Sequence, residues 1–97
     1  MIIPHAALEI MKLRLTRSAY QQATGLAKTF FGETALAAGF VDEIVMPEMV
    51  LSRAEEAAQE FAGLHQHAHA ATKLRARADT LKAIRAGIDR IEAEFGL

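Results

Sequence analysis

The chain has 97 residues with 12 acidic and 11 basic side chains, so its formal net charge is −1. A balance so close to zero gives no general attraction to nucleic acid or to an anionic membrane. The lack of cysteine excludes a disulfide framework and a zinc–thiolate site. Pro4, His5, Glu9 and Lys12 interrupt the N-terminal apolar run, so we expect neither a signal peptide nor a membrane span. We expect a cytoplasmic location.

The N-terminal half predicts two helices and a shorter helical run. Pro4 suits the first turn of a helix that continues to about Leu13. Thr16 or Ser18 is expected to cap a second helix that reaches about Phe30, with Gly25 marking a close helix contact inside it. The short run Glu33–Ala38 stops at Gly39, which we expect to adopt the left-handed conformation that ends many helices.

The stretch that follows predicts one short strand. Val41–Val45 lies between Gly39 and Pro47 and is rich in β-branched residues. A lone strand leaves its N–H and C=O groups unpaired along both edges. The only other candidate strand is the stub formed by residues 1–3, so the partner is this stub, another subunit, or a part of the protein that the sequence does not contain.

The C-terminal half predicts three further helices. Pro47 begins the third, with Glu48 in its first turn. The segment "HQHAHAATKLRARA" predicts a shorter fourth helix, and Asp79 or Thr80 is expected to cap a fifth. The fifth carries a narrow apolar stripe that suits packing against one or two helices and consists of Leu81, Ile84, Ile88, Ile91 and Phe95. The fold class is therefore mainly α, with five helices and one short strand.

The order of these features resembles the crotonase superfamily, the enoyl-CoA hydratases and isomerases. "FGETALAAGFVDEIV" followed by Pro47 and Glu48 is similar to the family's sequence of short helix, glycine, strand and next helix, although Gly32 stands where a Ser or Thr cap is usual. "PHAALEIMKLRLTRSAYQQA" and "ATKLRARA" are similar to flanking family segments. The resemblance implies the C-terminal helical part of the ClpP/crotonase fold, with residues 1–45 ending the core and residues 46–97 forming a helical layer.

The resemblance also implies a chemistry. Such proteins are lyases or isomerases of fatty acid metabolism that act on acyl-CoA thioesters, through an oxyanion hole of two backbone N–H groups and one or two carboxylates. No residue here matches the glycine-rich oxyanion segment or the catalytic glutamates, so we assign no catalytic and no cofactor-binding residue. The chain alone is expected to be inactive, with coenzyme A thioesters as substrates of the parent family only.

The resemblance leaves two kinds of partner and two functions open. The helical layer implies either a trimer-based homo-oligomer, which an Ala-rich core also favours, or an N-terminal crotonase body that is not in this sequence. The first function is that of the C-terminal portion of an enoyl-CoA hydratase/isomerase-like protein. The alternative is a non-catalytic helical oligomerisation or binding module.

Three groups of polar residues are candidate sites. His65 and His69 share a helix face, with His67 between them, but no third ligand stands at a recognisable spacing, so we interpret them as a solvated turn and expect no metal. We interpret the acidic group as a solvated helix face. For the basic group a solvated face is also the first interpretation, contact with coenzyme A phosphates is the second, and nucleic-acid binding is the last. The acidic group is Glu55, Glu56 and Glu60, and the basic group is Lys73, Arg75, Arg77, Lys82, Arg85 and Arg90.

Overall fold

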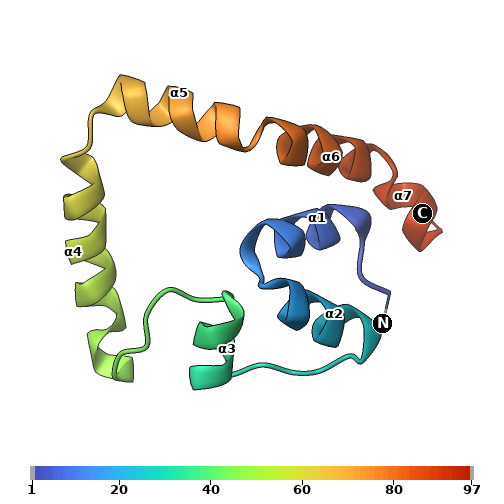
Figure 1. Ribbon diagram of the computed structural model, residues 1–97, viewed down its shortest axis with the longest axis horizontal. Coiled ribbons are helices and arrows are strands. Elements are labelled where there is room, and N and C mark those ends of the chain that lie inside the picture. Colours follow the sequence, from blue (N-terminus) through green and yellow to red (C-terminus); the bar gives the residue numbers. More distant parts are fainter. Residues whose placement is uncertain (1, 97) are drawn as a thin grey trace.

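The computed structural model describes residues 2–96, and in this range the protein is built from helices alone. Figure 1 shows a bent chain of helices whose two ends lie near each other. The elements are α1 (His5–Arg14), α2 (Arg17–Gly25), α3 (Glu33–Ala38), the 3₁₀ turn η1 (Pro47–Met49), α4 (Val50–Ala62), α5 (Gln66–Ala76), α6 (Ala78–Asp89) and α7 (Ile91–Phe95).

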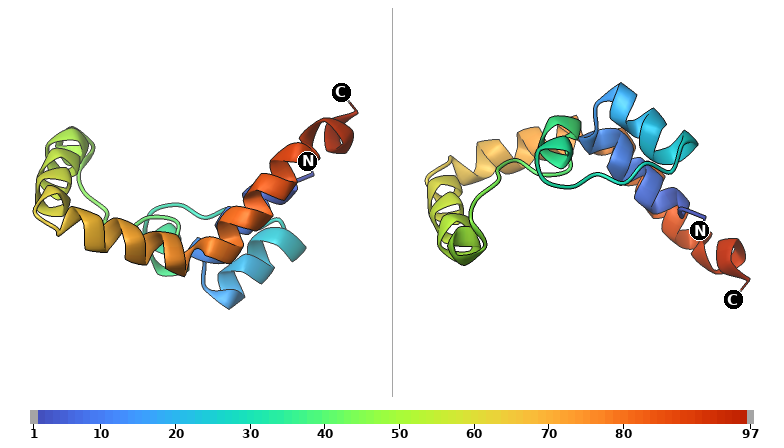
Figure 2. Two further views of the ribbon diagram at one scale, coloured as in Figure 1. Left: turned by 90° about the horizontal axis from the view of Figure 1, so that it is seen from above. Right: turned by 90° about the horizontal axis from the view of Figure 1, so that it is seen from below.

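The most extensive helix contact joins the two ends of the chain, where α6 lies along α1 (Figure 2). A glycine makes this contact close. A Cβ atom added at Gly87 would lie 2.8 Å from the Ala6 nitrogen and 3.2 Å from its Cα. Such distances leave no room for a side chain, so the backbones of α1 and α6 touch at this point.

An acidic side chain strengthens the same junction. The backbone N–H of His5 donates to both carboxylate oxygens of Glu94 at 3.4 Å, and the His5 imidazole also contacts this carboxylate. The first N–H groups of a helix have no partner within it and favour a negative charge nearby. Glu94 therefore ties α7 to the start of α1.

A small core joins α1, α2 and α3. Thr16 caps α2 by accepting a hydrogen bond from the Ala19 N–H at 3.1 Å, and its own N–H donates to the Ala38 carbonyl at 3.0 Å. Around these bonds Leu15, Ala19 and Ala38 are buried, with four partly buried residues packed against them: Met11, Tyr20, Ala23 and Phe30. Because most of the buried residues are alanines, this core removes little apolar area from water.

Helices α4 and α5 extend away from this core and form an arch that returns to α1 through α6 (Figure 1). The Cα radius of gyration is 16.3 Å, whereas a folded domain of this length has about 13 Å. The accessible surface is 7831 Å², compared with about 5,500 Å² for a folded monomer of 10.6 kDa. The excess, about 2,300 Å², is as large as an extensive protein–protein interface.

The prediction of a strand at Val41–Val45 was wrong for the part of the chain that the structure describes. These residues form an open connection between α3 and η1 with no ladder. A strand is defined by hydrogen bonds to a neighbour, and no second strand is present in residues 2–96. Of the proposed stub, Ile2 and Ile3 do not pair with this segment, and Met1 lies outside the described residues.

Other helix boundaries need smaller corrections. The second helix ends at Gly25 rather than near Phe30, and Ala27 adopts a positive φ of 54° that stops any continuation. Gly25 has no atom within 4 Å of an added Cβ, so it marks the end of a helix and not a close contact. The fifth helix starts at Ala78 without a side-chain cap and is divided at Arg90 into α6 and α7.

The short helix α3 confirms the expectation for Gly39. This residue has a φ of 100°, and its N–H and that of Phe40 close the helix on Ala35 and Leu36 carbonyls. A Cβ at Gly39 would lie 2.4 Å from the Arg14 carbonyl oxygen, so the glycine also brings α3 against the end of α1. Gly32 before α3 has a φ of 56° and a ψ of −131°, a region open mainly to glycine.

We predict that Gly87→Ala destabilises the protein by separating α1 from α6. Overpacking a close contact costs about 1–3 kcal/mol, and most of this range lies above the ~1 kcal/mol that alanine gains in helix propensity. The free energy of unfolding, measured by urea denaturation followed by circular dichroism, should fall for this variant.

Gly25→Ala is the matched control, because nothing surrounds Gly25 and its φ is ordinary. It should leave stability unchanged or raise it by about 0.4–1 kcal/mol. Equal behaviour of the two variants would contradict the close approach at Gly87.

Candidate functional site

An open groove lies between α3, residues 41–45 and α4, with a volume of about 830 Å³. This is within the range of about 300–1,000 Å³ that is usual for ligand pockets. Its walls are mostly apolar, while its charged residues are Asp42, Glu43, Arg53 and Glu60. The apolar wall consists of Phe31, Ala35, Val41, Ile44, Val45, Val50, Ala54, Ala57 and Phe61.

The backbone of one wall, residues 41–45, has no backbone hydrogen-bond partner in the part of the chain that the structure describes. The last backbone N–H held by α3 is that of Phe40, which donates to the Ala35 carbonyl at 3.0 Å, and the next backbone bond joins Met49 to Met46. Within residues 2–96, no backbone–backbone hydrogen bond involves Val41–Val45. The side chains of Val41, Ile44 and Val45 are 41%, 48% and 36% exposed. Both features are typical of a segment that pairs with another strand.

Arg53 links the two walls at the rim of the groove. Its guanidinium donates to both oxygens of Glu43, from Nε and Nη2 at 2.7 Å each, in a bidentate pair. The Nη1 atom lies 3.4 Å from carboxylate oxygens of Glu56 and Glu60. One arginine thus holds three carboxylates, and the rim keeps a net negative charge.

The hydrogen bonds at the rim shift the pKa values of Glu43 and Arg53. The bonds from Arg53 hold the pKa of the Glu43 carboxyl below its ordinary value of 4.5. The same bonds and the charge of Glu43 raise the pKa of Arg53 further, so the guanidinium stays charged. A second ion pair, from Arg14 Nη2 to Asp42 Oδ1 at 3.0 Å, holds the segment to the end of α1.

Several solved structures are similar to this chain in both sequence and fold. A probable enoyl-CoA hydratase from Mycobacterium tuberculosis H37Rv is 86% identical with a TM-score of 0.93, over 100% of this chain and 41% of that chain. An enoyl-CoA hydratase from Mycobacterium ulcerans Agy99 is 81% identical with a TM-score of 0.93, over 98% of this chain and 42% of that chain. An enoyl-CoA hydratase/isomerase family protein from Pseudomonas syringae is 33% identical with a TM-score of 0.85, over 93% of this chain and 39% of that chain.

The chain belongs to the crotonase superfamily of enoyl-CoA hydratases and isomerases. It matches the C-terminal helical portion of these proteins and spans about two fifths of the length of the solved relatives. No protein-family model and no curated protein matches the chain. The resemblance inferred from "FGETALAAGFVDEIV" and its flanking segments is therefore confirmed.

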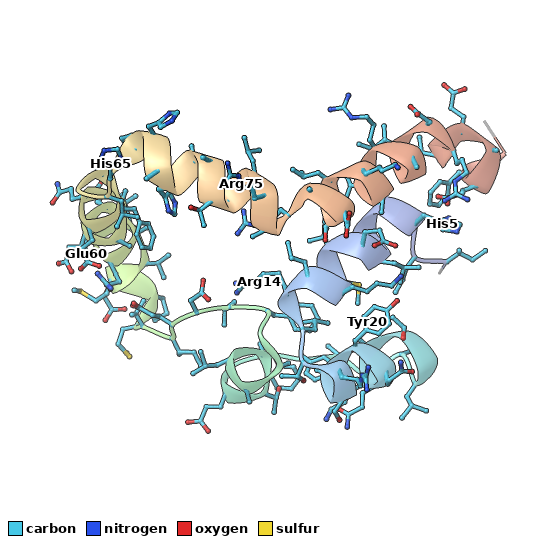
Figure 3. The ribbon with its side chains drawn as sticks, turned by 45° about the horizontal axis from the view of Figure 1, so that its top comes forward. His5, Arg14, Tyr20, Glu60, His65 and Arg75 are labelled. Atoms are coloured by element: carbon cyan, nitrogen blue, oxygen red, sulfur yellow. The ribbon has the colours of Figure 1, made fainter. Side chains whose placement is uncertain are left out.

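One of the histidines considered as metal ligands caps a helix. His65 is the N-cap of α5, where its Nδ1 accepts a hydrogen bond from the Ala68 N–H at 3.1 Å. Figure 3 shows His65 at the corner between α4 and α5, and His5 beside the C-terminal helices. Among the described residues, no group of three or more His, Cys, Asp and Glu side chains is placed to hold a metal ion.

The acidic and basic groups are distributed differently from each other. Glu56 and Glu60 converge on Arg53, whereas Glu55 has no ion pair within the described range. The six basic residues of the C-terminal third are spread over α5 and α6, at Arg77 between them and at Arg90 after α6, and all are exposed. No helix in the described part of the chain is long and apolar enough to cross a membrane.

The rim cluster was missed by sequence reasoning. The spacing of Arg53, Glu56 and Glu60 on one helix contains the signal for two of its contacts, because residues three and seven apart share a helix face. Glu43 gives no such signal, because the η1 turn determines whether it meets Arg53. Only the structure brings these four side chains together.

We predict that Glu43 titrates below 4.5 because Arg53 stabilises its charged form. A depressed native pKa adds stability that is present above the unfolded pKa and disappears as the pH falls through the native value. Carboxyl ¹³C NMR should show a Glu43 midpoint below 4.5, which returns to the ordinary range in Arg53→Met. An unchanged midpoint in that variant would contradict the assignment to Arg53.

Proposed function

We propose that the chain is the C-terminal helical portion of an enoyl-CoA hydratase or isomerase that acts on acyl-CoA thioesters. Its relatives are described as a probable enoyl-CoA hydratase and as an enoyl-CoA isomerase, at 86% and 85% identity. The groups that perform the chemistry lie in a part of such a protein outside these 97 residues. The role of the chain is then to complete the body that holds them.

The observation that supports this proposal is the unpaired segment Val41–Val45 beside the apolar groove. An exposed strand edge offers its free N–H and C=O groups for pairing, and exposed apolar walls favour being covered. A strand from the rest of the protein satisfies both requirements by adding to this edge, with its apolar side chains entering the groove. The excess surface of the chain is large enough for such an addition.

The charge of the groove bears on the position of the substrate. Coenzyme A carries several negative phosphate charges, whereas Glu43, Glu56 and Glu60 outnumber Arg53 at the rim. Like charges repel, so the groove itself is a poor phosphate site. The groove therefore accepts polypeptide in this proposal, and the acyl-CoA binds elsewhere in the completed protein. Trimer-based assembly and a cytoplasmic location remain predictions from the sequence.

Activity measurements on the isolated chain and on a chimera test the proposal. The 97-residue chain alone should not hydrate crotonyl-CoA, because this proposal places the oxyanion hole and the catalytic carboxylates outside it. A chimera that joins it to the preceding part of the Mycobacterium tuberculosis relative should process an enoyl-CoA thioester, as followed by the absorbance of the conjugated thioester. A control with the relative's preceding part alone should be inactive or insoluble.

Two results would contradict the proposal. Turnover by the isolated chain would place catalytic groups within it. A folded chimera that lacks all activity towards acyl-CoA thioesters would favour the non-catalytic helical module instead.

A further inference from the structure

The segment Val41–Val45 is attached to the rest of the molecule by its side chains rather than by its backbone. It lies in the connection between α3 and α4 (Figure 1), and the chain bends at Asp42. Within residues 2–96, the side-chain hydrogen bonds that reach it come from two arginines, Arg14 to Asp42 and Arg53 to Glu43. These two acidic residues are neighbours in sequence, yet their partners belong to different helices. The segment is therefore tied to both α1 and α4.

The two ties differ in strength. Arg53 holds Glu43 through two bonds of 2.7 Å, and the two side chains are 30% and 49% exposed. Arg14 holds Asp42 through one bond of 3.0 Å, and the Asp42 side chain is 84% exposed. Bidentate geometry strengthens an ion pair, whereas full exposure to water weakens it. The pair between Arg53 and Glu43 is therefore the main tie.

Apolar packing holds the rest of the segment loosely. Ile44 and Val45 line the groove and also a second hollow of about 490 Å³, and Arg53 lines both. Side chains that border two hollows have packing partners on only part of their surface. The contact that locates the segment relative to α4 is thus the ion pair of Arg53 with Glu43.

We propose that Arg53 is a positioning residue, which holds the Val41–Val45 segment in place through Glu43 before a strand adds to it. The pair uses side-chain atoms only, so within residues 2–96 the backbone N–H and C=O groups of the segment stay free. The segment is then ordered although its backbone is unpaired. This inference rests on the proposed function, because an ordered free edge is useful only where a strand adds to it.

The benefit of such a tie is entropic. A mobile segment loses conformational freedom when a partner strand fixes it, and this loss opposes pairing. A segment that Arg53 already holds has lost part of this freedom beforehand, so the addition of a strand is more favourable. An ion pair that is partly exposed shifts an equilibrium by about two- to fivefold. We expect a change of this size in strand pairing when the tie is removed.

Backbone order in the isolated chain tests the tie without reference to any partner. Order parameters from ¹⁵N relaxation are about 0.85 for rigid amides and below about 0.6 for flexible ones. The amides of Ile44 and Val45 should be close to the rigid value, even though they exchange rapidly with solvent. Glu43→Gln removes the carboxylate that Arg53 holds and should lower both order parameters towards the flexible value.

Glu56→Gln is the matched control. Glu56 also contacts Arg53, at 3.4 Å, but it lies on α4 itself, so the same change of charge leaves the tie to the segment intact. Its order parameters should equal those of the unchanged chain, and circular dichroism should show equal helix content for both glutamine variants. An equal loss of order in Glu56→Gln, or no loss in Glu43→Gln, would overturn the proposal.

A double-mutant cycle shows whether Arg53 acts through Glu43. Arg53→Met should lower the order of the segment as much as Glu43→Gln does. The double variant Glu43→Gln/Arg53→Met should lower it no further, because both changes remove the same contact. Additive losses in the double variant would contradict this link.

Hydrogen exchange in the chimera with the preceding part of the Mycobacterium tuberculosis relative tests the effect on pairing. Glu43→Gln should lower the protection of the Val41–Val45 amides about two- to fivefold, whereas Glu56→Gln should not change it. Equal protection in the two variants would overturn the role of Arg53 in pairing. A chimera without protection in this segment would instead contradict the proposed function, while the order parameters of the isolated chain would still decide whether Arg53 holds the segment.

Discussion

The close approach of α6 to α1 at Gly87 and Ala6 is the contact on which the rest of the structure depends. It joins helices from opposite ends of the sequence, and the carboxylate of Glu94 adds a polar tie at the start of α1. Without it, the C-terminal helices would lose their most extensive contact with the N-terminal helices. The contact uses backbone and small side chains, because a larger residue at position 87 cannot fit.

Because small residues make these contacts, large apolar side chains remain on the surface. A core built from alanines, Leu15 and a glycine contact buries few large side chains, and among the described residues none of them is fully buried. The large apolar residues are therefore left on two surfaces, the groove beside Val41–Val45 and the outer stripe of α6 and α7. The first of these surfaces also carries an unpaired backbone segment.

Relatives in the crotonase superfamily share this open arrangement. The chain matches the C-terminal portion of relatives that are more than twice as long, and a TM-score of 0.93 shows that the arrangement is the same in that setting. In these relatives the arch of α4, α5 and α6 is therefore one part of a longer chain. The proposed strand addition is one way of covering its apolar groove.

Local chemistry made several features predictable from the sequence. Gly39 ends α3 because glycine accepts a positive φ, Thr16 caps α2, and Pro47 opens the η1 turn that leads into α4. The features that were missed depend on residues distant in sequence. No local pattern places Gly87 against Ala6 or Glu43 against Arg53, and Val41–Val45 has the composition of a strand without a partner in this chain. The end of α2 was missed because Gly25 fitted the helical spacing, whereas the backbone turns at Ala27.

Hydrogen exchange of the Val41–Val45 amides tests most directly whether this segment awaits a partner from outside the chain. In the isolated chain these amides should exchange nearly as fast as in an unstructured peptide, while amides of α1 and α6 are protected. In the chimera with the preceding part of the Mycobacterium tuberculosis relative, they should become as protected as the helices. Strong protection of these amides in the isolated monomer would contradict the account, because it would show that the segment is already paired.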